Sequence, residues 1–266
     1  MFNFPRDSVA NVVFIAVAIC LVCSVLVSSA ATVLRPMQQA NKAFDQKENI
    51  LRAAGMLPAG ATQDAQGRGV DELFAQFTTR VVDLDTGEYV EDVDPSKYTQ
   101  VKAAKDPAQS RALSDVEDVA TIKRRENLGL VYLVEGEQGI EKVVIPVRGY
   151  GLWSTLYGYL ALEGDLETVA GLGFYDQKET PGLGGEVDNP IWKAKWPGVR
   201  LFDANGEPAV HLVKKRSPEG SESAAHEVDA LSGATITTRG VQNLVRFWTS
   251  DLGYGPYLKR LKSEAT

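Results

Sequence analysis

The stretch LGLVYLVEGEQGIEKVVIPV, residues 128–147, decides the fold class of this chain. Two runs rich in β-branched and aliphatic residues flank a short connection between Gly136 and Gly139. Such runs favour extended backbone, and a glycine-containing connection of this length is typical of two antiparallel strands. We therefore predict a β-hairpin here and an antiparallel sheet as the centre of the protein.

The segments on either side extend this sheet. Residues 153–177, WSTLYGYLALEGDLETVAGLGFYDQ, alternate β-branched and aromatic side chains, which predicts two more strands. Residues 79–90, TRVVDLDTGEYV, predict another strand with an Asp-Thr-Gly turn. The Asn-Gly pair in ANGEP predicts a hairpin between the runs VRLFD and AVHLVKK, over residues 199–215.

The last long helix is predicted within TTRGVQNLVRFWTSDLG, residues 237–253. Apolar side chains recur there at helical spacing on one face, and Gly253 ends the pattern. That face is formed by Val241, Leu244, Val245 and Trp248. We expect the helix to begin at Thr237 or Thr238.

Other helices are expected outside the sheet-forming runs. Residues 36–54 predict a polar helix that stops at Gly55, and residues 188–196 predict a short helix with an Asp or Asn cap. The charged and irregular stretch 94–127 is expected to form a surface excursion with a short helix. The fold class that follows is α+β, an antiparallel sheet with flanking helices.

The N-terminal part has a different composition. Residues 8–34 contain no charged residue and no proline, and as a helix they would rise roughly 40 Å, enough to cross a hydrocarbon core of about 30 Å. The apolar region of a cleaved signal peptide is shorter, at about 7–15 residues. We therefore predict a membrane anchor over residues 1–35, in contact with lipid, and a soluble domain over residues 36–266.

Composition also excludes some functions. The chain of 266 residues has a formal net charge of -7 and no stripe of Lys and Arg, so we expect no binding to nucleic acid. Cys20 and Cys23 lie within the apolar run, where we expect packing thiols rather than a redox or zinc pair. His211 and His226 have no partner ligands at useful spacing, so we expect no metal site.

Residues 228–241, VDALSGATITTRGV, carry several hydroxyls with little side-chain bulk at the predicted start of the last helix. A helix N-terminus has unpaired N–H groups and a positive dipole end, which together suit a phosphate. Gly233 and Ala234 would let a bulky group approach the backbone, and Asp229 could orient a hydroxyl or help bind a metal during attachment. The residues alone leave two interpretations open, a helix-capping loop or a site where a group is bonded to a hydroxyl.

DALSGAT, residues 229–235, matches the flavinylation motif that ends in S/T-G-A-T. In that motif FMN is joined through its phosphate to a threonine hydroxyl. Around it the chain resembles the C-subunit family of bacterial Na+-translocating NADH:quinone oxidoreductases. The resembling segments are GLWSTLYGYLALEGDLETV, ETPGLGGEV, WPGVRLFD, SGATITTRGVQNLVRFW and LGYGPYL. The motif alone would also admit the related G-subunit of the Rnf complex, whereas GLWSTLYGYLAL and WPGVRLFD favour the quinone reductase.

The resemblance implies that FMN is attached by a phosphoester to Thr235, with Thr237 as the second choice. A separate flavin transferase would make the bond, and Asp229 would serve attachment. The residues expected to shape the phosphate and ribityl end are Ser232, Gly233, Ala234, Thr237 and Thr238.

A second candidate for the flavin site is ETPGLGG, residues 179–185. As a plain structural element it would be a tight Pro-Gly loop. As part of a flavin site, Gly182 and Gly184 would let the backbone lie against a flat ring while Leu183 packs on it. Glu179 and Thr180 would supply polar contacts to the ring edge and so tune the flavin. Trp153 is a further candidate, for the pocket wall.

The function implied by the resemblance is that of an electron carrier between NADH and ubiquinone, working with the other subunits of a membrane complex. The family places the soluble domain on the periplasmic side of the bacterial inner membrane. The basic residues favour the opposite topology, because Arg6 alone precedes the span and several follow it. Two other functions remain open, a carrier of the Rnf type and a membrane-anchored ligand-binding or sensor domain.

Overall fold

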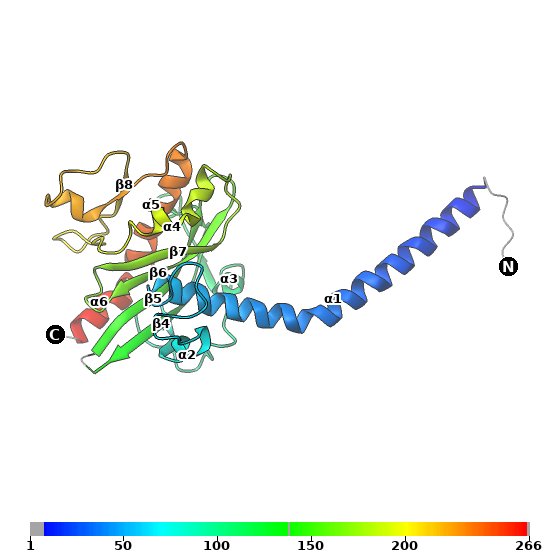
Figure 1. The fold of residues 1–266 in the computed structure, drawn as a ribbon, viewed down its shortest axis with the longest axis horizontal. Coiled ribbons are helices and arrows are strands. Elements are labelled where there is room, and N and C mark those ends of the chain that lie inside the picture. The colour runs from blue at the N-terminus through cyan, green and yellow to red at the C-terminus, as the bar shows by residue number, and fades with distance from the viewer. Residues whose placement is uncertain (1–7, 138, 265–266) are drawn as a thin grey trace. The chain divides into compact units, whose positions relative to one another are not determined.

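The computed structural model describes residues 8–137 and 139–264 (Figure 1). The chain divides into two compact units, Met1–Asp45 and Gln46–Thr266. Helix α1, Val9–Ala53, continues from the first unit into the second. Among the described residues it is the one helix long and apolar enough to cross a membrane, and the mean hydropathy of its most apolar window is 2.8.

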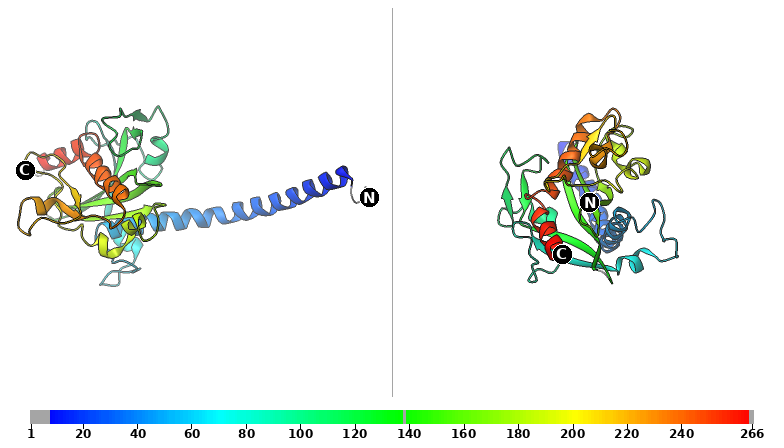
Figure 2. Two further views of the ribbon diagram at one scale, coloured as in Figure 1. Left: turned by 90° about the horizontal axis from the view of Figure 1, so that it is seen from above. Right: turned by 90° about the vertical axis from the view of Figure 1, so that its left-hand side faces the viewer.

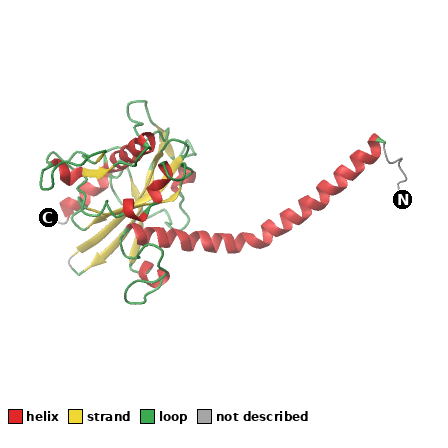
Figure 3. Ribbon diagram, turned by 45° about the horizontal axis from the view of Figure 1, so that its top comes forward, coloured by secondary structure: helices red, strands yellow, loops and turns green. Residues whose placement is uncertain are grey.

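Residues 36–54 do not form a separate helix, contrary to the sequence prediction. Pro36 lies inside α1, which runs through it to Ala53 (Figure 3). A proline inside a helix removes one backbone hydrogen bond but does not forbid continuation on both sides. The predicted stop at Gly55 is close to the observed end, and this glycine has a positive φ of 70°. Arg6, on which the topology count depends, lies outside the described residues.

The second unit is built on a five-stranded antiparallel sheet in the order β1-β4-β5-β6-β7 (Figure 1). The predicted hairpin over residues 128–147 is confirmed, with Tyr132 opposite Val144 in the register. The two strands predicted over residues 153–177 are also confirmed. The strand predicted over residues 79–90 is confirmed up to Asp83, and after the turn only an isolated bridge pairs Tyr89 with Val82. The strands of this sheet are β1 (Phe77–Asp83), β4 (Leu128–Gly136), β5 (Gly139–Tyr150), β6 (Thr155–Glu163) and β7 (Val169–Asp176).

Both faces of the sheet are buried, because successive side chains of a strand point to opposite faces. On β5, Val143 and Ile145 belong to one core and Val144 to the other. The second core is closed by the end of α1, where Ile50 and Leu51 are fully buried. Figure 2 shows the last turns of α1 and the C-terminal helices on opposite sides of the strands. This arrangement confirms the predicted α+β class.

Helices α5 (Thr235–Thr249) and α6 (Gly255–Glu264) cover the other face of the sheet. The apolar stripe predicted for the last long helix is confirmed, and the Trp248 indole donates a hydrogen bond of 2.7 Å to the carbonyl of Arg148. The predicted bounds of this helix were wrong at both ends. It begins two residues earlier than Thr237 and ends at Thr249, four residues before Gly253, and α6 was not predicted.

The remaining elements are short. Residues 94–127 are not only a surface excursion as predicted, because Arg125 and Glu126 are fully buried and Glu126 pairs with Arg148 at 2.6 Å. The short helix predicted near Asn189 is confirmed. These elements are α2 (Val70–Phe74), α3 (Gln100–Ala103), β2 (Ser110–Ala112), β3 (Arg124–Glu126), η1 (Gly184–Asp188), α4 (Pro190–Lys193), β8 (His211–Val213), η2 (Ser223–His226) and β9 (Glu227–Asp229).

The hairpin predicted over residues 199–215 is reduced to an isolated antiparallel bridge between Phe202 and Pro208. Its second run contributes β8 instead to a parallel pair with β9. The turn residue Gly206 has a positive φ of 81°, as an Asn-Gly turn requires. The parallel pairing of β8 with β9 sets the start of the loop that leads into α5.

Candidate functional site

The loop of residues 230–234, called here the attachment loop, connects β9 to α5 and leads directly to Thr235, the candidate attachment residue. It is tied to β8 at its start, where the Ala230 N–H donates to the Val213 carbonyl at 2.8 Å. Gly233 has a positive φ of 72°, a conformation that strains side-chain-bearing residues. Ala234 is the N-cap residue of α5 and provides no side-chain cap. The first turn of α5 therefore has backbone N–H groups open to an external acceptor.

The three threonines at the start of α5 lie in different environments. Thr237 is 1% exposed, and its hydroxyl donates to the Glu179 carboxylate at 2.7 Å. Thr238 is 6% exposed, and its hydroxyl accepts a hydrogen bond of 3.1 Å from the Leu231 N–H. Thr235 is exposed, and its hydroxyl has no hydrogen-bond partner within the described chain. Thr235 alone among them presents an accessible hydroxyl.

Glu179 joins three segments of the site. Its carboxylate accepts hydrogen bonds from the backbone N–H groups of Leu152, Trp153 and Ser154 at 2.9–3.1 Å and from the Thr237 hydroxyl. Burial by itself would raise the pKa of Glu179, but these hydrogen bonds outweigh burial and lower the pKa below its ordinary value. In this structure the carboxylate thus holds the loop before β6 against α5.

The glycine loop that follows Glu179 packs closely against this network. A Cβ on Gly184 would lie 2.5 Å from the Thr237 hydroxyl oxygen and 2.8 Å from a Glu179 carboxylate oxygen. The Thr180 carbonyl accepts from the N–H groups of Leu183 and Gly185, which closes the loop. Gly182 has a positive φ of 76°, as the turn requires. Gly184 is therefore needed for the contact with α5.

Large apolar side chains are exposed around the same place. Trp153 is 64% exposed and Leu183 is 45% exposed, although each lies on backbone that Glu179 or the glycine loop holds in position. Leu183 reaches the attachment loop, since its Cδ2 would lie 3.0 Å from a Cβ built on Gly233. Ile236, on the first turn of α5, is 57% exposed. These side chains offer apolar surface for a flat ring near Thr235.

Asp229 lies at the end of β9, and its side chain is engaged with the segment around α4. Its carboxylate pairs with Lys195 at 2.6 Å, and its carbonyl accepts from the Trp192 indole N–H at 2.8 Å. The two contacts fix the end of β9 against α4. Among the described residues, no group of three or more His, Cys, Asp and Glu side chains is placed to hold a metal ion.

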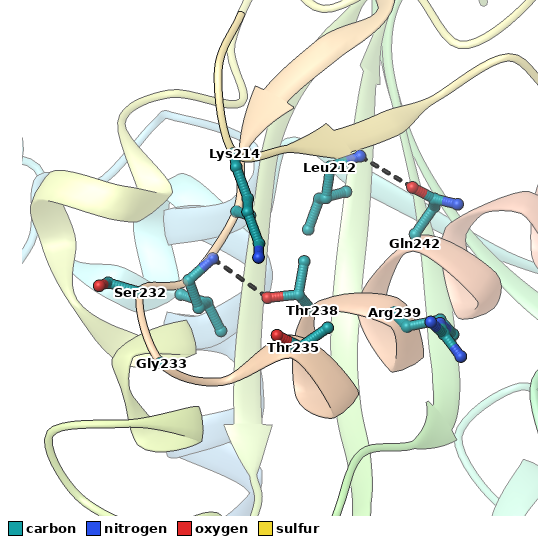
Figure 4. Close-up of a pocket in the computed structure, with 10 residues that line it drawn as sticks. Leu212, Lys214, Ser232, Gly233, Thr235, Thr238, Arg239 and Gln242 are labelled. Carbon is teal, nitrogen blue, oxygen red and sulfur yellow. Dashed lines mark hydrogen bonds between the residues drawn. The ribbon is translucent and has the colours of Figure 1, made fainter.

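A cavity of about 560 Å³ opens beside Thr235 (Figure 4). Strand β8, the attachment loop and α5 supply its walls, and none of the lining residues is acidic. It brings together the predicted residues Ser232, Gly233, Thr235 and Thr238. The full lining is Leu212, Lys214, Ala230, Leu231, Ser232, Gly233, Thr235, Thr238, Arg239 and Gln242.

Sequence reasoning missed Lys214, Arg239 and Gln242 at this site. Lys214 follows β8, twenty-one residues before Thr235, and only the parallel pairing of β8 with β9 brings it to the cavity. Arg239 was within reach of prediction, because it lies four residues after Thr235 and so on the same helix face. Gln242 anchors β8 to α5 by accepting from the Leu212 N–H at 2.9 Å.

Comparisons with known proteins agree on one family. Residues 151–250 match the family model of the FMN-binding domain. The chain is 48% identical to the C-subunit of the Na(+)-translocating NADH-quinone reductase of Pseudomonas aeruginosa, and 97% of each chain is covered. The protein of the same name from Vibrio campbellii is also 48% identical, again with 97% of each chain covered.

Solved structures give the same result. The crystal structure of Shewanella oneidensis NqrC matches with a TM-score of 0.74 and 36% identity over 84% of this chain and 99% of that one. The crystal structure of the corresponding reductase chain from Parabacteroides distasonis matches with a TM-score of 0.62 and 27% identity over 85% of this chain and 96% of that one. This chain belongs to the NqrC family, the C-subunits of the Na+-translocating NADH-quinone reductase.

Proposed function

We propose that this chain carries FMN bonded through a phosphoester to the Thr235 hydroxyl. The observation that carries the proposal is the difference between Thr235 and its neighbours. The hydroxyls of Thr237 and Thr238 are buried and hydrogen-bonded, whereas that of Thr235 is exposed beside a cavity. A phosphate on Thr235 would face the unpaired N–H groups and the positive dipole end of α5.

The flavin ring is proposed to lie on the apolar side chains near Thr235, chiefly Trp153 and Leu183. Glu179 positions both of them indirectly, because it binds the backbone of the Trp153 loop and begins the loop that carries Leu183. We therefore assign Glu179 to positioning the pocket rather than to ring-edge contact, and Gly184 to the close packing of this loop against α5. Thr180 and Gly182 shape the same loop.

Attachment is proposed to depend on a separate flavin transferase. A threonine hydroxyl is a poor nucleophile without an activating group, and within the described chain no base lies against the Thr235 hydroxyl. Asp229 is paired with Lys195 in this structure, so any contribution to attachment would require that ion pair to open. The chain itself supplies the exposed hydroxyl and a glycine-containing loop that a transferase can approach.

Bound FMN would supply the capacity to accept and pass on electrons, and we propose that the chain relays them from NADH towards quinone within the complex. The other subunits of the reductase are its proposed partners, and membrane lipid surrounds the apolar part of α1. We place the soluble domain, residues 36–266, on the periplasmic side of the bacterial inner membrane and the anchor in residues 1–35. Covalent attachment suits that location, since the bond prevents loss of a cofactor made elsewhere.

The proposal is tested by expressing the full chain with and without a flavin transferase and viewing the denatured protein under ultraviolet light. We expect a fluorescent band only with the transferase. In the assembled reductase, Thr235→Val should stop electron flow from NADH to quinone while the complex still assembles. Normal electron flow in that variant would contradict the relay.

A further inference from the structure

Two cations border the cavity beside Thr235. Lys214 extends from the end of β8 towards the start of α5, and Arg239 lies one helical turn beyond Thr235 (Figure 4). Neither side chain forms a hydrogen bond or ion pair with any residue in the described ranges 8–137 and 139–264. Both are therefore available to a ligand in the cavity.

The cavity is lined by two basic residues and no acidic ones, although the chain as a whole has a net charge of -7. Two other lysines near the site are already paired, Lys195 with Asp229 and Lys193 with Asp188 at 3.2 Å. Lys214 points towards the open start of α5, and Arg239 borders the same cavity from the second turn of that helix (Figure 4). Two unpaired cations at one cavity form a local positive field, which attracts an anion with acceptor oxygens. The Ser232 and Thr238 hydroxyls lie in the same lining.

We propose that Lys214 and Arg239 bind the non-bridging oxygens of the phosphodiester that links FMN to Thr235. This inference rests on the proposed function, because it concerns the phosphate of that same flavin. The α5 N–H groups would fix the direction of the phosphate, and the two cations would neutralise its charge. No bond is made or broken by either residue.

The assignment predicts that the site distinguishes FMN from riboflavin, which lacks the phosphate. The first test uses the Thr235→Val chain, in which no phosphoester can form, and measures the dissociation constants of FMN and of riboflavin. We expect FMN to bind about tenfold or more tightly than riboflavin, in keeping with charge-assisted hydrogen bonds. The double substitution K214M/R239M should remove most of this preference and leave riboflavin binding unchanged, while the control K215M should keep the preference in full. Equal affinities in the Thr235→Val chain would contradict the assignment.

A second measurement does not depend on the Thr235→Val chain, which would give no comparison if it bound neither FMN nor riboflavin. The wild-type chain is loaded with FMN by the transferase, and the phosphodiester is observed by ³¹P NMR. We expect Lys214→Met and Arg239→Met each to move its resonance and Lys215→Met to leave it in place. An unchanged resonance in both test variants would overturn the inference while the adduct on Thr235 still stood. Failure of the wild-type chain to load would count instead against the proposed function.

Discussion

The two sides of the first turn of α5 show how differently neighbouring hydroxyls can be used. On the side of Glu179, the Thr237 hydroxyl and three backbone N–H groups all meet one buried carboxylate. On the side of the cavity, Thr235, Lys214 and Arg239 have no partners among the described residues. Buried polar groups must be paired within the fold, so the first side provides structure. On the second side, the unpaired hydroxyl and cations remain available to bind a ligand.

The largest expected effect is on covalent flavin, and it distinguishes the cavity side of α5 from the Glu179 side. Thr235→Val should abolish covalent flavin completely because it removes the exposed hydroxyl, while Thr237→Val should retain the covalent flavin. The stability of the Thr235 variant should change by less than about 0.5 kcal/mol, since the site is exposed. Flavin fluorescence of the denatured protein, together with denaturant unfolding, checks both expectations. A loaded Thr235→Val chain would contradict the assignment.

Gly184→Ala should disturb the Glu179 side most strongly. Its Cβ would come within 2.5 Å of the Thr237 hydroxyl oxygen, so the loop or the helix must shift at a cost of roughly 1–3 kcal/mol. The matched control is Gly69→Ala, where a Cβ would meet nothing within 4 Å. Thermal unfolding measures both variants. If Gly184→Ala were as stable as wild type, the close packing of the glycine loop against Thr237 would be contradicted.

Glu179→Gln should destabilise the apo chain by roughly 1.5–3 kcal/mol at pH 7, because it replaces a charged acceptor of four donors with a neutral one. The lowered pKa of Glu179 adds a pH dependence. The carboxylate contributes its full stabilisation above the ordinary pKa of 4.5 and loses it as the pH falls through the lower folded-state value. The stability gap between wild type and the variant should therefore be largest above about pH 4.5 and narrow as the pH is lowered further, measured by urea unfolding. A constant gap would contradict the charge-based role.

Trp153→Ala should have little effect on the stability of the apo chain. The side chain is 64% exposed, so truncation should change the free energy of unfolding by less than about 0.5 kcal/mol. Its effect should appear in the loaded protein, as brighter flavin fluorescence and a shifted absorption band once an aromatic neighbour is removed. Trp248→Ala is the opposite control, because that buried indole is part of the core and its loss should cost about 3–5 kcal/mol. An unchanged flavin spectrum in Trp153→Ala would place the ring elsewhere.

The sheet was predictable because strands β4 to β7 alternate or concentrate apolar residues between clear turns. The last helix was predictable for its apolar face at Val241 and Leu244 but not for its first residue. Thr235 and Ile236 carry no helical signal of their own, and the start is set by the pairing of β8 with β9. That parallel pair joins segments fourteen or more residues apart, which no local pattern reveals.

The sequence predicted which segments form the candidate site, but not which of their side chains contact one another. Thr235 and the glycine loop were found from motifs, whereas the link between Glu179 and Thr237 spans 58 positions and depends on the tertiary fold. The same holds for Asp229, whose partner Lys195 lies in the turn after α4. Lys214 was missed because a single lysine after a strand is usually solvent-exposed and uninformative.

Peptide mass mapping of the wild-type chain loaded by a flavin transferase tests the central claim most directly. The account predicts an FMN-sized increment on the peptide that contains residues 232–238, with fragment ions that place it on Thr235. An increment on Thr237 would contradict the account, because that hydroxyl would first have to leave the Glu179 carboxylate and become exposed.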